Sequence, residues 1–172
     1  MKRWLSLWRE DERGVSAVEF ALLLPVLLTI LLGSVTVFDL FRTAQSAEKG
    51  TFTVGDMLSR QTSISNSTLN SMLTLLNQTV SHDGTTSLRA SSISNNAGTL
   101  VLNWSHTVGV PASSLEPIDY AIVPQIASGD SVILTETFIP HEAMVASFGL
   151  EEVTFSNKAV HRPRFVSRIA YQ

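Results

Sequence analysis

The stretch that decides the fold runs from Phe20 to Phe38 and reads FALLLPVLLTILLGSVTVF. Its nineteen residues include no charged side chain. As a helix rising about 1.5 Å per residue, the stretch measures about 28 Å, close to the roughly 30 Å hydrocarbon core of a bilayer. A buried core helix fits poorly, because the segment is apolar on every face and the rest of the chain is too small to surround it. We therefore interpret the segment as a membrane-spanning helix.

A cleaved secretory signal peptide is the main alternative for this segment. The apolar part of such a peptide has about 7–15 residues and ends at a small-residue cleavage site. Here the apolar run is longer and Glu19 stands at its entrance, while Ala44-Gln45-Ser46 forms a poor cleavage site. A membrane-spanning helix fits these features better than a signal peptide does.

The basic residues that flank the apolar run indicate its orientation. Four precede it and two follow it: Lys2, Arg3, Arg9 and Arg13 on one side, Arg42 and Lys49 on the other. The positive-inside rule counts such residues and predicts a cytoplasmic N-terminus. The chain after about residue 42 is then expected on the far side of the membrane.

Composition and charge exclude several classes of protein. The 172 residues are enough for one domain, and only 16% of them are charged, against about 25% in a typical soluble domain. The formal net charge of -3 argues against a nucleic-acid binder held by phosphate contacts. The absence of cysteine excludes disulfides, Cys-ligated metal sites and thiol nucleophiles.

The junction before the apolar run carries the most specific motif. Residues 13–20 read RGVSAVEF, so Gly14 follows a basic residue and precedes Glu19 by five positions. This spacing resembles the cleavage motif of type IV-like prepilins, and G-x-x-x-x-E-F is the form of the Flp/Tad branch. Residues 19–28, EFALLLPVLL, look specifically like TadE-like pseudopilins, in which a proline follows the Glu-Phe pair by five residues. The run Arg162-Pro163-Arg164 is also similar to that family's ending.

The resemblance implies processing, partners and location. A prepilin peptidase, which is a membrane aspartyl protease, would cut between Gly14 and Val15, and Glu19 with Phe20 would serve recognition and assembly. The implied partners are this peptidase, a sister pseudopilin and the major Flp pilin. The implied location is the inner membrane, with a single span and a periplasmic head, and with incorporation into the extracellular pilus left open. The implied function is pilus assembly, surface adhesion and biofilm formation.

Physical chemistry gives the junction residues a rationale of their own. Gly14 has no side chain to obstruct a protease that approaches the backbone. Val15 and Glu19 are four residues apart, so they share one helix face, and the new Val15 amine can neutralise Glu19 in its own chain or in the next subunit. The alternative is a glutamate that only reaches the headgroups. Pro25 removes one backbone donor, so a bend is expected there.

Beyond the membrane the helix is expected to continue toward about Arg60. Gly50 and Gly55 are expected to be weak points in it. One face of the helix is expected to carry an apolar stripe, formed by Phe38, Phe41, Ala44 and Phe52. The segment 61–67 is expected to be a loop. Asn66 or Ser67 would cap a second helix that ends by 82–84 and has a core-facing stripe, formed by Leu69, Met72, Leu73, Leu76 and Val80.

Strands are expected in the remainder. A hairpin is predicted from residues 88–93 and 99–108, with its turn at 95–98 and apolar residues alternating along its second arm, and 111–124 is expected to be irregular. Further strands are predicted at 131–139, 153–156 and 165–171, with a short helix or turn over 141–148. The predicted fold class is α+β and pilin-like: a long N-terminal transmembrane helix, a short helix and a small antiparallel sheet. The predicted parts are a leader (1–14), a transmembrane helix (15–42) and a head (43–172).

The sequence contains no recognisable catalytic or metal motif. The four histidines show no metal-ligand spacing and are expected on the surface or in turns. No phosphate loop, dinucleotide motif or nucleophile elbow is present, so no catalytic residue, cofactor, metal or small-molecule substrate is assigned. Arg162 and Arg164 would share a face if their segment were extended. We favour a solvated strand face there over a docking surface for an acidic partner.

Two classes of function therefore remain. The first is a minor pseudopilin of a tight-adherence pilus. The second is a single-pass, membrane-anchored periplasmic binding module unrelated to pili, and a small anchored hydrolase is a weaker third. Cleavage that depends on Gly14 separates the first two classes.

Overall fold

The structure is a computed structural model that describes residues 13–80, 86–109, 116–143 and 152–172. The chain divides into two compact units, with the boundary between Phe38 and Asp39, and each unit is described by itself. The helices are α2 (Arg13–Ser59), α3 (Asn66–Thr79) and the short 3-10 helix η2 (Tyr120–Ile122). The strands are β1 (Ser63–Ile64), β2 (Ser87–Asn96), β3 (Thr99–Val108), β4 (Ser131–Glu142), β5 (Glu152–His161) and β6 (Ala170–Tyr171).

The N-terminal unit consists, in its described part, of the apolar portion of α2. By length and composition, α2 from Gly14 onward can cross a membrane. Its hydroxyl groups are satisfied within the helix: Thr29 Oγ1 donates to the Pro25 carbonyl at 2.8 Å, and Ser34 Oγ to the Leu31 carbonyl at 2.8 Å. A hydrocarbon environment requires such internal pairing. The predicted helix is confirmed, and its end at Ser59 agrees with the expected end near residue 60.

In the second unit, residues 39–59 of α2 are positioned by two glycines that allow close approach. A Cβ on Gly50 would stand 2.8 Å from Leu76 Cδ1, and one on Gly55 would stand 2.6 Å from His161 Nδ1. The sequence predicted weak points at these glycines. In the structure, α3 packs close to the helix at Gly50 and β5 packs close to it at Gly55. A side chain at either position would collide with the neighbouring element.

The second helix begins one or two residues earlier than predicted. Ser65 is the N-cap and forms a capping box with Thr68, whereas Asn66 and Ser67 were the expected caps. The segment expected to be a loop contains β1, and α3 ends at Thr79, before the turn predicted at 82–84, which lies outside the described residues. The predicted apolar stripe is confirmed as a core face: Leu69, Leu76 and Val80 are buried, and Met72 and Leu73 pack beside them.

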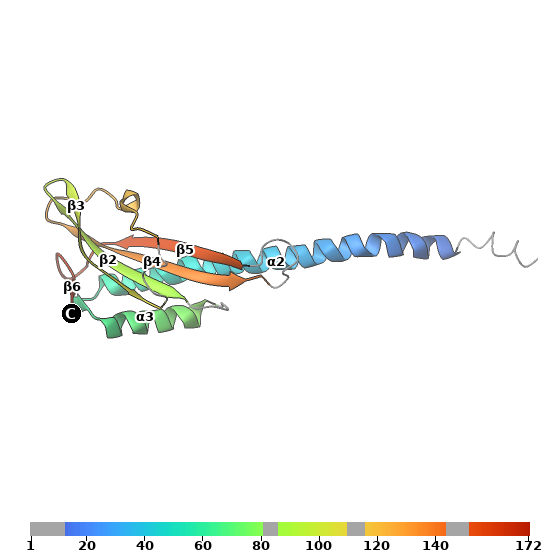
Figure 1. Ribbon diagram of the computed structural model, residues 1–172, viewed down its shortest axis with the longest axis horizontal. Coiled ribbons are helices and arrows are strands. Elements are labelled where there is room, and N and C mark those ends of the chain that lie inside the picture. The colour runs from blue at the N-terminus through green and yellow to red at the C-terminus, as the bar shows by residue number, and fades with distance from the viewer. Residues whose placement is uncertain (1–12, 81–85, 110–115, 144–151) are drawn as a thin grey trace, which may run out of the picture. The chain divides into compact units, whose positions relative to one another are not determined.

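Four strands form one antiparallel sheet in the order β3-β2-β4-β5 (Figure 1). The predicted hairpin is confirmed as β2 and β3. Its turn contains Ala97 and Gly98, both with positive φ, which is the conformation that a tight hairpin turn requires. Strand β4 begins where predicted but extends through Glu142, so residues 141–142 are in a strand rather than in the expected helix or turn. The remainder of that prediction, 144–148, lies outside the described residues.

A β-bulge divides the second arm of the hairpin. Ile93 pairs with Leu102, but the preceding Ser92 pairs with Trp104, so Asn103 is an extra residue in β3. Side chains alternate along a strand, and one extra residue exchanges the faces beyond it. Trp104 therefore lies on the opposite face from Leu102, although simple alternation places them together.

The end of the chain differs from the predicted last strand. Only Ala170 and Tyr171, within the expected 165–171, form a strand. This β6 pairs in parallel with β1, as Ser63 with Ala170 and Ile64 with Tyr171. Strand β5 is longer than the expected 153–156. The α+β class and the antiparallel sheet are confirmed, and the small parallel pair is an addition to the prediction.

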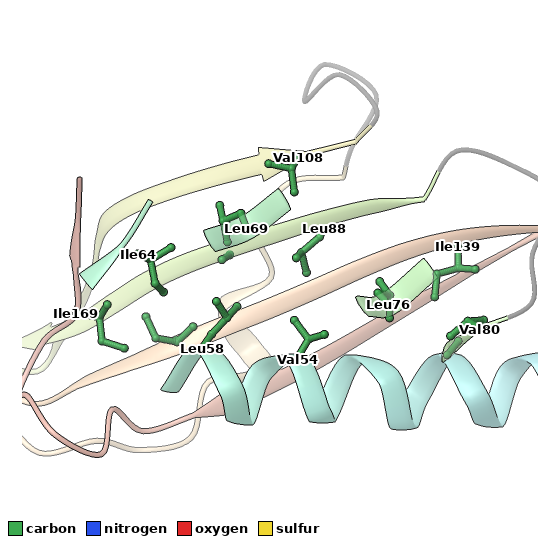
Figure 2. Close-up of a cluster of buried hydrophobic side chains, with 13 residues drawn as sticks. Val54, Leu58, Ile64, Leu69, Leu76, Val80, Leu88, Val108, Ile139 and Ile169 are labelled. Carbon is green, nitrogen blue, oxygen red and sulfur yellow. The ribbon is translucent and has the colours of Figure 1, made fainter. Parts of the chain in front are cut away.

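Each face of the sheet carries a hydrophobic cluster. The larger cluster joins α2, α3 and the sheet, with Val54 and Leu58 facing Leu76, Leu88 and Ile139 (Figure 2). The smaller cluster lies on the other face, where Ile93, Val132 and Leu134 pack with Ile126 from the segment after η2. Its remaining contacts come from Leu100, Ile118, Val123 and Val160. The sheet is thus covered by helices on one face and by an irregular segment on the other.

Candidate functional site

The glycine of the predicted cleavage site has no structural requirement in the described part of the chain. Gly14 lies in the first turn of α2 and has no positive φ. No described atom lies within 4 Å of the position that its Cβ would take. Glycine destabilises a helix by about 1 kcal/mol relative to alanine, so packing and backbone geometry do not explain its presence. Access for a protease, the role predicted for Gly14 from the sequence, stays a prediction.

The neighbouring residues are solvent-accessible and lie on a regular helix. Val15 is 55% exposed and Phe20 is 59% exposed. Glu19 is exposed, and no described residue forms an ion pair with it. One helical turn separates Val15 from Glu19, so the geometry that the predicted amine–carboxylate contact needs is present. The roles of Gly14, Val15, Glu19 and Phe20 stay predictions.

Pro25 lies inside α2, as expected. Its ring nitrogen has no hydrogen to donate to the carbonyl of Ala21. Thr29 Oγ1 donates to the Pro25 carbonyl, one turn beyond the missing bond. The predicted bend at Pro25 stays a prediction.

The two arginines near the C-terminus follow β5 and do not lie in a strand. Arg162 pairs with Asp130, which precedes β4, and Arg164 pairs with Asp56 of α2. Both arginine side chains remain more than half exposed, at 61% and 53%. Each guanidinium therefore links the end of the chain to another element of the head, and a docking role for either stays a prediction.

Asp56 lies at the centre of a small polar cluster. Arg60 Nη2 is 2.7 Å from Asp56 Oδ2, and Arg164 binds the other carboxylate oxygen. Hydrogen bonding from Arg60, supported by Arg164, holds the pKa of Asp56 below its usual range. The nearby His161 ring packs against Phe52 with 4.7 Å between centroids. Burial lowers the pKa of His161, Arg164 lowers this pKa further, and Asp56 acts in the opposite direction.

The lowered pKa of His161 predicts a loss of stability on acidification. The folded chain holds His161 neutral, whereas the unfolded chain binds a proton below about pH 6.5. Stability is therefore complete above about pH 6.5 and falls as the pH drops through the folded pKa. We expect His161→Gln to flatten this part of the pH dependence, measured as the thermal midpoint of the full chain in detergent between about pH 7 and pH 5. An equal slope in variant and wild type would contradict the assignment. The lowered pKa of Asp56 acts below this window.

A buried ion pair was not found from the sequence. Glu136 of β4 is fully buried, and its Oε2 is 2.6 Å from Nε of Arg89 in β2. Arg89 also donates through Nη1 to the Glu116 carbonyl at 2.7 Å, and Lys158 Nζ lies 4.0 Å from Glu136 Oε1. Carboxylates are rarely buried unless paired. The available signal was the position of Glu136 within β4, a strand rich in apolar and β-branched residues, where a buried charge requires a partner.

Two of the histidines also differ from the prediction. His141 is 5% exposed, lies in β4, and places Nε2 at 3.0 Å from Asp39 Oδ2. His161 lies in β5, so neither residue is in a turn or free on the surface. His106 stacks on Tyr171 with 3.4 Å between centroids, and His82 lies outside the described residues. Among the described residues, no group of three or more His, Cys, Asp or Glu side chains is arranged to hold a metal ion.

Comparison with known proteins identifies a family that the chain resembles. Residues 14–56 match the family model described as TadE-like protein. This range covers the junction, the apolar run and most of α2, and it excludes the sheet. No curated protein and no solved structure matches the chain. The family resemblance that the junction indicated is thereby confirmed.

Proposed function

We propose that this chain, whose residues 14–56 match the TadE-like family model, is a minor pseudopilin of a tight-adherence pilus. Prepilin peptidase removes residues 1–14, and the mature chain remains a single-pass inner-membrane protein with a periplasmic head. There it acts with a sister pseudopilin and the major Flp pilin in assembly, and so in adhesion and biofilm formation.

One observation supports this proposal above the others. Gly14 occupies a helical position at which neither packing nor backbone conformation among the described residues requires glycine. A plain membrane anchor gives Gly14 no specific role at this position. A peptidase substrate does, because the enzyme must reach the backbone between Gly14 and Val15.

The proposed assembly step depends on the charge that cleavage creates. The released Val15 amine carries a positive charge one helical turn from Glu19. A carboxylate at the membrane boundary is stabilised by a partner of opposite charge. When the amine of one subunit meets Glu19 of the next, the contact defines their axial register within the assembly.

Replacing Glu19 by alanine tests this step. We expect cleavage after Gly14 to continue, because the scissile bond is unchanged, and the number of surface pili to fall strongly. Pili are counted by electron microscopy, and processing is read from the N-terminal residue. Glu142→Ala, which removes an exposed glutamate far along the chain, is the control and should leave pili unchanged. Normal pilus numbers with Glu19→Ala would show that the pairing role is wrong.

A further inference from the structure

Among the described residues, the outer edge of β5 has no strand partner. Strand β5 is the last in the order β3-β2-β4-β5, with β4 on one side (Figure 1). No described residue pairs with its other side, and no hydrogen bond from a described residue outside the sheet reaches its backbone. Alternate backbone groups along an antiparallel edge point outward and require hydrogen-bond partners.

This edge lacks the devices that usually protect one. Natural edge strands are commonly guarded by proline or by an outward lysine. Strand β5 contains no proline, and its charged residues are Glu152, at its first position, and Lys158. That lysine lies against the loop-covered face, with Nζ 3.7 Å from Asp119 Oδ2 and 4.0 Å from Glu136 Oε1. Its charge is therefore engaged within the head and does not guard the edge.

An open groove of about 1010 Å³ runs beside the same edge. Its floor is formed by five consecutive residues of β5, Ser156 to Val160, and its walls come from α2 and from the segment that includes η2. The walls present apolar side chains to solvent, with Phe52 63% exposed and Ile122 40% exposed. Glu48 and Lys49 at the rim carry opposite charges, so the groove offers no field of a single sign.

We propose that this groove binds an extended segment of another pilus subunit, which adds to β5 as a further strand. The backbone of an extended segment matches the repeat of the open edge, and an apolar side chain at alternate positions fits between Phe52 and Ile122. A partner helix satisfies its own backbone and would leave the β5 groups unpaired. The mixed charges of the rim select a segment of low net charge. That the segment comes from another pilus subunit rests on the proposed function. That the segment is extended is inferred from the unpaired edge of β5 and the groove beside it.

Hydrogen exchange of the full chain tests the proposal. Two membrane samples are compared, and both contain the full chain. One comes from cells that also make the remaining Tad subunits, and the other from cells that lack them. We expect the β5 amides to exchange at least about tenfold more slowly when the other subunits are present. The amides of β3, the other edge of the sheet, are the internal control and should not change. Equal exchange of β5 in the two membranes would overturn the proposal, and so would slow exchange in the chain alone, because the occupant would then be a second copy.

A matched pair of variants locates the contact. Ile122 and Val101 are exposed to almost the same extent, 40% and 41%, but only Ile122 lines the groove. We expect Ile122→Asp to abolish the protection of β5 and Val101→Asp to preserve it. Protection that survives Ile122→Asp would overturn the proposal. The N-terminal residue is determined in the same samples: a start at Val15 without β5 protection overturns only the docking, whereas an uncut chain contradicts the proposed function.

Discussion

Replacing Gly14 by tryptophan is expected to leave the chain uncut in cells that contain the Tad prepilin peptidase. The indole would stand where the enzyme must approach the backbone of the scissile bond. Space among the described residues does not limit the substitution, since none of their atoms lies within 4 Å of the Cβ position. The uncut variant should therefore insert into the membrane and retain its head, and differ from wild type only in processing. The readout is intact mass together with the N-terminal residue.

Gly33→Trp is the control for this experiment, because it places the same side chain on the same helix, beyond the junction. We expect the Gly33 variant to be cut normally and to begin at Val15. Efficient cutting of Gly14→Trp would rule out the proposed cleavage site. Failure of both variants to be cut would point to impaired insertion, which membrane fractionation of the two variants measures directly.

The largest loss of stability is expected for Arg89→Met. This change removes the guanidinium from a fully buried Glu136 and leaves Lys158, 4.0 Å from Glu136 Oε1, as its nearest cation among the described residues. Breaking a buried pair typically costs about 3–5 kcal/mol, and Lys158 should place the result near the lower end. The measurement is denaturant unfolding of the full chain in detergent micelles.

The double variant Arg89→Met/Glu136→Leu is the matched control. It removes both charges, so no uncompensated carboxylate remains in the interior, and most of the lost stability should return. A single variant that costs less than about 1 kcal/mol would contradict the assignment of a tightly coupled buried pair. A double variant less stable than the single one would do the same.

The helical part of the fold could be predicted because its signals are local. The charge-free run, the continuation of α2 to Ser59 and the apolar stripe on α3 all follow from side-chain spacing along one helix. The hairpin of β2 and β3 was also accessible, since the turn residues Ala97 and Gly98 lie between two runs of strand-forming residues.

Features that depend on distant residues were not accessible. The parallel pair of β1 and β6 joins residues more than a hundred positions apart, and each strand is only two residues long, too short for any periodic signal. The bulge at Asn103 depends on the register with β2, and alternation along β3 alone would place Trp104 on the same face as Leu102. The N-cap Ser65 precedes the predicted caps by one or two residues, within the usual uncertainty of helix ends.

The functional residues also divide into those that local sequence predicts and those that depend on contacts between distant residues. Gly14, Val15 and Glu19 are recognisable because their relation is a fixed spacing at the start of one helix. The pairing of Arg89 with Glu136, and the open groove beside β5, require the order of strands in the sheet, which no spacing along the chain reveals. Sequence therefore indicates the processing segment, and structure adds the surfaces of the head.

The N-terminal residue of the chain, purified from cells with an active Tad-type prepilin peptidase, tests the central claim most directly. We expect the chain to begin at Val15 and this start to be lost when the peptidase is inactivated. A chain that still begins at Met1 in the presence of the active peptidase would contradict the claim and favour a plain membrane anchor. A start near residues 44–47 would contradict it as well, because the apolar helix would then be a secretory signal.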